Sequence, residues 1–306
     1  MNKLLILISF VFSLSALGSL TDFNREWVSH LEQKATVVSD IRHLPYSFVH
    51  PTKTKYSIIV THGLFESPYY MTGIGQSLYY EGYNVLSVLL PGHWEKDLKS
   101  IDHISAIEWK KELDKTIELA SMIGEKIILI GHSTGGLLSL EPMIEHDERI
   151  AAAVLLAPAI KISKKVKFAA SLGKMFNIDI NKLTDNLPDG YDVPYVSASG
   201  SDLVQNSIER ILGQNKKERI LHYQKIRKPI FLIYPEADLV IDNGEYENLI
   251  NSVNAEMRVK IFSRQTGVDH ASISKTAIDT YIGFPTYFNH EAGEMVREMV
   301  RFIREL

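Results

Sequence analysis

Cysteine does not occur anywhere in this sequence of 306 residues. Its absence excludes disulfide bonds, thiolate catalysis and metal sites built on cysteine. The 11 histidines are scattered along the chain, without the His-Glu-x-x-His spacing of a zinc site. Low-complexity tracts and internal repeats are also missing. The sequence therefore predicts neither a metal ion nor a cofactor.

An excess of basic residues is missing as well. The 33 lysines and arginines are outnumbered by 37 acidic residues, which gives a net charge of -4. This balance offers no extended positive surface, so we expect no nucleic-acid partner. Hydrophobic residues make up 45% of the chain and charged residues 23%, as in soluble globular proteins. The length suits one large α/β domain or two small ones.

The first twenty residues differ in composition from the rest of the chain. Lys3 precedes an almost unbroken apolar run, and the small residues Ala16 and Gly18 stand where a signal peptidase would read them. The run is about 14 residues long, short of the roughly 20 that span a bilayer. We expect residues 1–18 to be a signal peptide and the protein to be exported, either to the periplasm or out of the cell. The alternatives are an uncleaved membrane anchor and a buried first helix.

Segments with strand and helix patterns alternate along most of the chain. Apolar runs of strand length lie at residues 56–61, 83–90, 127–132, 151–157, 229–234 and 257–262. Helical patterns lie at residues 24–34, 69–80, 106–122, 134–145, 245–251 and 291–306, and Ser105 and Glu108 form a capping box before one of them. We expect an extended stretch after the first helix, through Val37, and an edge strand at Val49. The alternation predicts a mostly parallel sheet with helices on both faces.

The alternation stops between residues 159 and 223. Because this segment is too long for an ordinary loop, we interpret it as a helical cap inserted over the C-terminal edge of the sheet. The core then comprises residues 19–158 and 224–306. Within the cap we expect a basic amphipathic helix over residues 160–176, a turn-rich stretch over 186–201 and a helix over 203–212. The basic helix is typical of transient contact with an anionic membrane, and the alternative is that its lysines are simply solvated.

The strand at 127–132 runs into Gly131-His132-Ser133-Thr134-Gly135, and a helical pattern follows. Strand, Gly-x-Ser-x-Gly and helix in this order are typical of a nucleophile elbow, which exposes the serine hydroxyl on a strained turn. A Cβ at Gly131 or Gly135 would collide with the neighbouring strand or helix. Free N–H groups at the helix start can stabilise negative charge beside Ser133. The alternative is a glycine-rich turn with an ordinary capping serine.

Acyl transfer by a serine requires a base, a carboxylate that orients the base, and N–H donors for the oxyanion. Ser133, Asp238 and His270 each follow a predicted parallel strand, so the sheet brings them to one edge. Their chain order is the order of nucleophile, acid and base in α/β-hydrolases. The turn His62-Gly63 follows another strand, and we expect the N–H groups of Leu64 and Thr134 to form the oxyanion hole. The loop histidine His93 is better explained as fixing a turn, and His62 and His132 as structural or hydrogen-bonding residues.

Together these segments resemble the α/β-hydrolase superfamily, in particular its group of monoglyceride lipases, lysophospholipases and serine aminopeptidases. The matching pieces, in chain order, are His62-Gly63-Leu64, Leu90-Pro91-Gly92-His93, Gly131-His132-Ser133-Thr134-Gly135-Gly136, Glu236-Ala237-Asp238 and Asp269-His270. Two departures reshape the rim of the site. Pro235 stands where the group usually has glycine, and Gly92-His93-Trp94 replaces the usual Gly-His-Gly.

The resemblance implies that Ser133 is the nucleophile, His270 the general base and Asp238 the acid of a catalytic triad. Glu236 and Asp242 lie close to Asp238 but do not fit the family spacing, and Asp269 is adjacent to the base, from where a carboxylate rarely reaches the ring.

The expected activity is hydrolysis of carboxylic esters of small molecules with an acyl chain, by a carboxylesterase or lipase acting on monoacylglycerol- or lysophospholipid-like substrates. A serine peptidase or amidase on the same scaffold is the main alternative, and it would need an acidic or polar site for a substrate amine in the cap. A non-catalytic binding module is less consistent with a complete triad. A haloalkane dehalogenase would need a carboxylate in place of Ser133. The sequence does not specify the acyl-chain length or head group of the substrate, or the oligomeric state of the protein.

Overall fold

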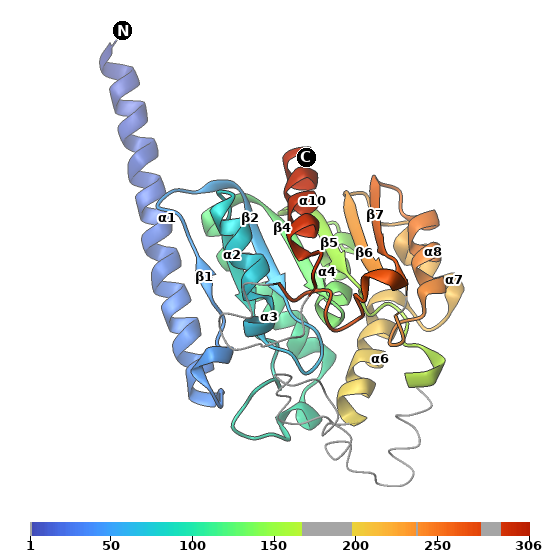
Figure 1. Ribbon diagram of the computed structural model, residues 1–306. Helices are drawn as coiled ribbons and strands as arrows, with labels where there is room; N and C mark the ends of the chain where they lie inside the picture. The colour runs from blue at the N-terminus through green and yellow to red at the C-terminus, as the bar shows by residue number, and fades with distance from the viewer. Residues whose placement is uncertain (1, 167–197, 237, 277–288) are drawn as a thin grey trace.

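The computed structural model describes residues 2–166, 198–236, 238–276 and 289–306, with side chains from Leu20 onward. Seven strands in these ranges form one sheet with the order β1-β3-β2-β4-β5-β6-β7 (Figure 1). All neighbours pair in parallel except β1, which is antiparallel to β3. The strands are β1 Ser47–Phe48, β2 Thr54–Thr61, β3 Asn84–Val88, β4 Gly124–His132, β5 Ile150–Leu156, β6 Ile230–Pro235 and β7 Met257–Phe262. The predicted mostly parallel sheet is confirmed, and β1 lies just before Val49, where the edge strand was expected.

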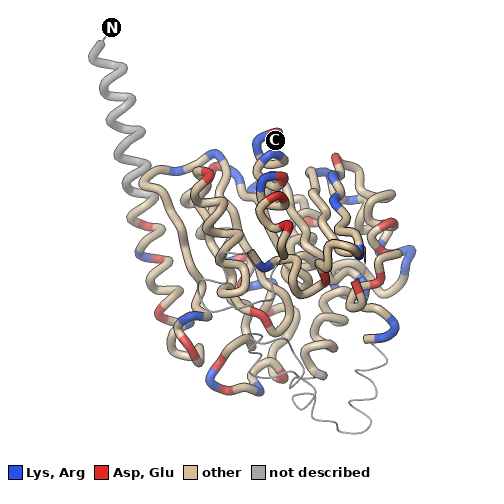
Figure 2. The backbone as a smooth tube through the Cα atoms, in the orientation of Figure 1, with Lys and Arg blue, Asp and Glu red and all other residues tan. Residues whose placement is uncertain are grey.

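Helices cover both faces of this sheet. The described helices are α1 Asn2–Val37, α2 Thr72–Tyr80, α3 Ala106–Ile123, α4 Thr134–Ile144, α6 Ala198–Leu212, α7 Lys216–Tyr223, α8 Asn243–Ser252 and α10 Ala292–Arg304. Short 3-10 turns lie at Ile41–His43, Pro68–Met71, Ser100–His103 and Arg264–Thr266. The capping box at Ser105 and Glu108 begins α3, as predicted. Charged residues of both signs are spread over the helices and loops (Figure 2).

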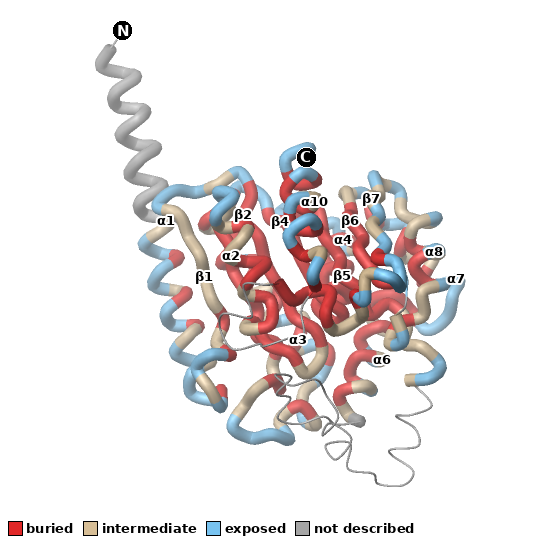
Figure 3. The backbone as a smooth tube through the Cα atoms, viewed as in Figure 1, coloured by how far each residue is buried: buried red, intermediate tan, exposed pale blue. Residues whose placement is uncertain are grey.

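Two apolar clusters hold the helices onto the strands. Because successive strand residues point to opposite faces, Ile59 and Leu129 belong to the cluster with α3 and α4, whereas Ile58 and Ile130 belong to the cluster with α2 and α10. The inner strands β3, β5 and β6 are accordingly buried along almost all of their length, whereas the edge strands β1 and β7 are more exposed (Figure 3). Parallel pairing places Thr61 opposite Gly131, and Gly131 opposite Leu155. The loops that follow β2, β4 and β5 therefore leave the same edge of the sheet.

The first helix is longer than predicted. The expected extended stretch through Val37 is wrong, because α1 continues to Val37 and the amide of Val38 still donates to the carbonyl of Lys34 at 3.0 Å. Contacts at this end of the helix explain the continuation: Lys34 pairs with Glu112 of α3 at 2.6 Å, and the carbonyl of Val37 accepts a hydrogen bond from the amide of Lys96 at 2.8 Å. Tertiary contacts of this kind outweigh the weak helix propensity of a few β-branched residues.

The segment between β5 and β6 contains α6 and α7 and is only partly described. The predicted helix over 160–176 is wrong at residues 160–163, which are bent and form an isolated bridge from Ile162 to Ile241. A helical start lies at residues 164–166, and the rest of the predicted helix lies outside the described residues. The predicted turn-rich stretch is wrong at residues 198–201, which belong to α6. Arg210 of α6 forms an ion pair with Glu141 of α4, with its second nitrogen, Nη2, 2.7 Å from the carboxylate. The division into core and cap stays a prediction.

Within the residues whose side chains the structure describes, no helix combines the length and apolar composition needed to cross a membrane. The same residues contain no group of three or more side chains arranged to hold a metal ion.

Candidate active site

Ser133 lies on a strained turn between β4 and α4. Its backbone has φ 49° and ψ -111°, in the positive-φ region that costs a residue with a side chain about 1–3 kcal/mol. The turn is held by hydrogen bonds from the Ser133 amide to the carbonyl of Leu156, at 2.9 Å, and from the Gly135 amide to the carbonyl of His62, at 3.1 Å. The elbow predicted from the sequence is therefore present in the backbone.

The two glycines of the elbow have no room for a side chain. A Cβ on Gly131 would lie 2.3 Å from the carbonyl carbon of Gly135, and a Cβ on Gly135 would lie 2.2 Å from the oxygen of Thr61. Both contacts are with backbone atoms, which cannot rotate away. The predicted collisions are confirmed, and they explain the Gly-x-Ser-x-Gly spacing.

A line of hydrogen bonds connects the three predicted triad residues. The Nε2 atom of His270 is 2.9 Å from the hydroxyl oxygen of Ser133, and its Nδ1 atom is 2.8 Å from Oδ2 of Asp238. With the ring proton on Nδ1, the imidazole donates to Asp238 and leaves Nε2 free to accept the serine proton. The side chain of Asp238 is fully buried and that of His270 is 13% exposed, so the base is reachable while the acid is enclosed.

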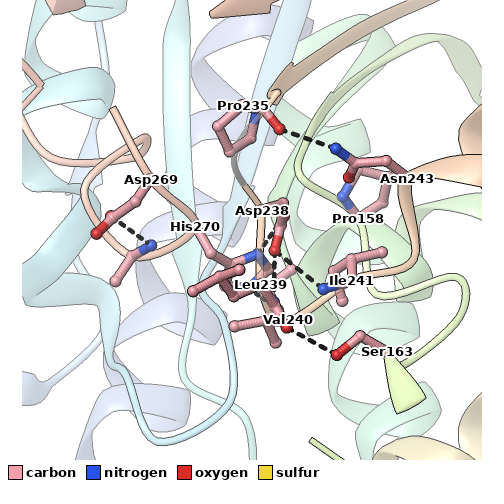
Figure 4. Close-up of polar contacts among 12 residues, drawn as sticks. Pro158, Ser163, Pro235, Asp238, Leu239, Val240, Ile241, Asn243, Asp269 and His270 are labelled. Carbon is pink, nitrogen blue, oxygen red and sulfur yellow. Dashed lines mark hydrogen bonds and ion pairs between the residues drawn. The ribbon is translucent and has the colours of Figure 1, made fainter. Parts of the chain in front are cut away.

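The loop after β6 holds Asp238 in place (Figure 4). Its Oδ1 atom accepts hydrogen bonds from the amides of Val240, at 2.8 Å, and Ile241, at 2.9 Å, which leaves Oδ2 for His270. The hydroxyl of Ser163 donates to the carbonyl of Leu239 at 2.7 Å and ties this loop to the segment after β5.

The competing carboxylates make other contacts. Asp242 pairs with Lys161 at 2.8 Å and caps α8. Glu236 accepts a hydrogen bond from the amide of Arg264, and Asp269 accepts from the amides of Ala271 and Ser272. The structure therefore brings Asp238 to His270, and it orients these three carboxylates toward other partners.

The loop after β2 lies against the serine. His62 donates from Nδ1 to the carbonyl of Gly63 at 2.7 Å and accepts the amide of Leu90 at Nε2, at 3.1 Å. Burial, followed by the neighbouring His93, lowers the pKa of His62 to about 3, so the ring is neutral and its tautomer is fixed. A Cβ on Gly63 would lie 3.2 Å from the Cβ of Ser133, which shows how closely the turn approaches the serine.

The two residues predicted to supply the oxyanion hole line one cavity with Ser133. Thr134 is the first residue of α4, so helix geometry leaves its amide without an intrahelical acceptor. Leu64 is followed by Phe65, whose φ of 62° is unusual for a bulky residue and marks a tightly turned loop. His93, by contrast, directs Nδ1 toward the carbonyls of Leu90 and Pro91, in the turn-fixing position expected for it.

A cavity of about 430 Å³ opens in front of Ser133 and His270. Most of its described lining is apolar, and a polar strip comes from α6. The apolar residues are Leu64, Phe65, Ala159, Ile162, Val166, Val204, Val240 and Ile241, and the α6 strip is Ser201, Asp202 and Gln205.

Sequence reasoning missed two residues near the site, Glu66 and Lys275. Both are buried, and Lys275 Nζ lies 2.9 Å from Glu66 Oε1. They are 209 positions apart in the sequence. The only signal available was that each follows a predicted catalytic segment by a few residues.

Comparison with known proteins identifies the family to which this chain is similar. Residues 52–266 match the family model described as Serine aminopeptidase, S33. No curated protein matches the chain.

Solved structures with a similar fold include a monoacylglycerol lipase from Paleococcus ferrophilus, with TM-score 0.60, 19% identity and coverage of 84% of this chain and 96% of that one. A monoglyceride lipase from Saccharomyces cerevisiae has TM-score 0.61, 15% identity and coverage of 86% and 90%. A structure described under the metagenome-derived lipolytic enzymes LipS and LipT has TM-score 0.62, 15% identity and coverage of 86% and 97%. At these identities the likeness concerns the fold. Because the family model extends over more than half of the chain, the protein is an α/β-hydrolase that belongs to the Serine aminopeptidase, S33 family of serine hydrolases.

Proposed function

We propose that the protein hydrolyses carboxylic esters through an acyl-enzyme formed on Ser133. The observation that carries this proposal is the hydrogen-bonded line from Asp238 through His270 to Ser133, at the mouth of an apolar cavity. A serine on a strained turn, a base within hydrogen-bonding distance and a buried carboxylate behind the base are the three parts that acyl transfer requires.

The reaction follows from these positions. Ser133 Oγ attacks the ester carbonyl carbon while its proton moves to Nε2 of His270, and Asp238 stabilises the resulting imidazolium. The negative oxygen of the tetrahedral intermediate accepts hydrogen bonds from the N–H groups of Leu64 and Thr134. One such donor typically stabilises the transition state by about 2.7–4 kcal/mol. The leaving alcohol takes the proton from Nε2. Water then loses a proton to His270 and attacks the acyl-enzyme, which releases the carboxylic acid and restores Ser133.

The cavity lining supports an acyl chain as one part of the substrate. The residues around it are mainly aliphatic, and each methylene group buried there gains about 0.8 kcal/mol. A substrate with a longer chain therefore binds more tightly until the cavity is filled.

The α6 strip supports a neutral head group that carries hydrogen-bond donors. Ser201 and Asp202 contribute a hydroxyl and a carboxylate to this strip, and both groups can accept hydrogen bonds. Asp202 is the only acidic side chain in the described lining, which contains no lysine or arginine. Glycerol hydroxyls suit these acceptors, whereas a phosphate meets an acidic side chain and no described cation. We therefore place monoacylglycerol-like esters ahead of lysophospholipids.

Asp202 also supports a second candidate function. A peptidase or amidase needs an acidic group for a substrate amine, and Asp202 supplies one in the cavity wall. The family name points in the same direction.

One substrate panel separates these functions. Initial rates are measured on p-nitrophenyl esters of increasing chain length, a monoacylglycerol, a lysophospholipid and an aminoacyl arylamide. We expect hydrolysis of the medium or long esters and the monoacylglycerol, with no turnover and no fluorophosphonate labelling in Ser133→Ala. A preference for the arylamide that Asp202→Asn abolishes would replace esterase with aminopeptidase. A wild-type protein that fluorophosphonate does not label would exclude serine catalysis altogether.

We also propose that residues 1–18 direct export and are removed. The support is the apolar composition of this run and its small residues. N-terminal sequencing of the protein recovered from periplasmic, secreted and membrane fractions tests this, and an intact Met1 in the membrane fraction would favour the uncleaved anchor. The expected transient membrane contact of the cap stays a proposal too, and of its lysines Lys161 is already paired with Asp242 at 2.8 Å.

A further inference from the structure

Glu66 is a buried carboxylate in the loop that follows β2, only 2% exposed. Its Oε2 atom accepts the amide of Gly63 at 2.9 Å and lies 2.7 Å from Nδ1 of His132. Its Oε1 atom accepts the ammonium group of Lys275 at 2.9 Å. One carboxylate thus connects the loop that carries Leu64, the residue before Ser133 and the loop that follows His270.

His132 continues the connection toward the base. Its second ring nitrogen, Nε2, lies 2.8 Å from the backbone carbonyl oxygen of His270. Both nitrogens therefore face acceptors, and a ring with only one N–H would direct a lone pair at one of them. Burial favours the neutral form of Glu66, but His132 and Lys275 outweigh it and hold the pKa of Glu66 well below its usual value. The ring of His132 thus lies between the carboxylate of Glu66 and the carbonyl of His270, with one nitrogen directed at each.

Lys275 makes a parallel connection. Besides Glu66, its ammonium group donates to the carbonyl of Ala271 at 2.7 Å and lies 5.2 Å from the ring centre of Tyr70. Its side chain is 2% exposed, so water does not screen these contacts. Two consecutive carbonyls, those of His270 and Ala271, are therefore held by side chains that both contact Glu66.

We propose that Glu66 is a positioning residue that fixes the His270 loop relative to the oxyanion loop through His132 and Lys275. This inference rests on the proposed ester hydrolysis, in which His270 and the N–H of Leu64 act on the same substrate carbonyl. Catalytic groups need placement to within about 0.5 Å, and a misplacement of about 1 Å can cost a factor of about 100 in rate. A single anion that holds both loops controls their separation directly.

Replacing Glu66 by glutamine tests the connection. The neutral amide leaves the buried ammonium group of Lys275 without its counter-ion and holds the ring of His132 less firmly than a carboxylate does. The contacts of these two side chains with the carbonyls of His270 and Ala271 therefore weaken. By analogy with residues that orient metal ligands, kcat on a p-nitrophenyl ester falls about 10- to 100-fold. KM changes little, because the cavity lining is untouched.

Glu112→Gln is the matched control. Glu112 is also buried between a histidine and a lysine, with His30 Nε2 at 3.2 Å and Lys34 Nζ at 2.6 Å. It belongs to α3 and contacts α1, and it does not line the cavity. This variant loses stability and keeps kcat, when both proteins are assayed at a temperature where unfolding curves show them fully folded.

A second pair of variants tests the same connection if the Glu66→Gln protein does not fold. Lys275→Met lowers kcat and Lys275→Arg restores most of it, because arginine can still donate to Glu66 and to the carbonyl of Ala271. The double variant Glu66→Gln/Lys275→Met is no slower than the slower single variant, as expected for partners in one network.

Fluorophosphonate labelling separates failure of this inference from failure of the proposed function. Labelling of Ser133 in the wild type is independent of the natural substrate, and its rate falls in Glu66→Gln in step with kcat. Equal labelling rates and equal kcat in wild type, Glu66→Gln and Lys275→Met would overturn the positioning role while leaving serine catalysis intact. Absence of labelling in the wild type would instead remove the function on which the inference rests.

Discussion

Two buried glutamates in this protein have the same kinds of partner and different places in the fold. Glu66 contacts His132 and Lys275, and Glu112 contacts His30 and Lys34. In each case burial opposes ionisation and the two neighbours overcome it, so both carboxyl pKa values are lowered.

The difference lies in what each cluster joins. Glu112 connects two helices, α1 and α3, whose relative position is also fixed by packing of Phe23 and Trp27. Glu66 connects two loops at the C-terminal edge of the sheet, the one that follows β2 and the one that carries His270. The same three side-chain types therefore stabilise the fold in one place and, in our proposal, set catalytic geometry in the other.

The largest difference is expected when the lysine is removed from each cluster. Lys275→Met leaves an enclosed carboxylate short of its cation, and breaking a buried pair in this way costs about 3–5 kcal/mol. Lys34→Met should cost less, about 1–2 kcal/mol, because Lys34 is 14% and Glu112 11% exposed and water can replace part of the contact. Urea unfolding at neutral pH measures both values. Equal losses in the free energy of unfolding would contradict the expectation that the deeper burial of the Glu66 cluster makes its lysine more costly to remove.

A smaller difference is expected in the response to acid. A carboxyl whose pKa is lower in the folded state contributes stability that is complete above its unfolded pKa and is lost as the pH falls through the folded pKa. With an ordinary value of 4.5 for both residues, this loss begins below about pH 4.5, at up to about 1.4 kcal/mol per pH unit for each proton.

Substitution separates the two contributions. Because the pKa of Glu66 is the more strongly lowered, Glu66→Gln should flatten the acid limb of a stability curve between pH 3 and pH 6 more than Glu112→Gln does. The measurement is urea unfolding at half-unit pH steps. An acid limb as steep in Glu66→Gln as in the wild type would contradict this assignment.

The smallest effect is expected for the distant histidine. His30→Gln should leave kcat unchanged, because His30 contacts Glu112, lies beside the ring of Trp27 and does not line the cavity. His132→Gln should lower kcat, since glutamine cannot donate to both Glu66 and the carbonyl of His270. The measurement is kcat from steady-state kinetics for both variants, together with their unfolding curves. A matching fall in kcat for His30→Gln would show that activity follows overall stability.

What the sequence predicted well is what local patterns determine. The apolar run before Gly131, the missing side chains at Gly131 and Gly135 and the helical pattern after Ser133 together specify the elbow, and all of them lie within about a dozen residues. The meeting of Asp238 and His270 was predictable because parallel strands deliver their following loops to one edge. Their catalytic roles stay predictions.

What the sequence could not predict depends on long-range packing. No spacing links Glu66 to Lys275 across 209 positions, because their contact arises from the folding of two loops onto one edge. The continuation of α1 to Val37 was missed because Thr36 and Val37 have weak helix propensity, whereas the carbonyl of Val37 is held by the amide of Lys96, far along the chain. The start of α6 at Ala198 was missed because Ser199 and Gly200 have a turn-like composition.

The ion pair between Arg210 and Glu141 defines a boundary for engineering. It fastens α6 to α4, the helix that begins beside the nucleophile, so α6 belongs mechanically with the hydrolase body even though it lies within the predicted insertion. A chimera designed to change specificity would therefore exchange residues 167–197 alone and keep α6 from the parent. A graft that also replaced α6 would have to bring its own partner for Glu141, or leave that buried carboxylate with Lys110 as the cation that remains beside it among the described residues.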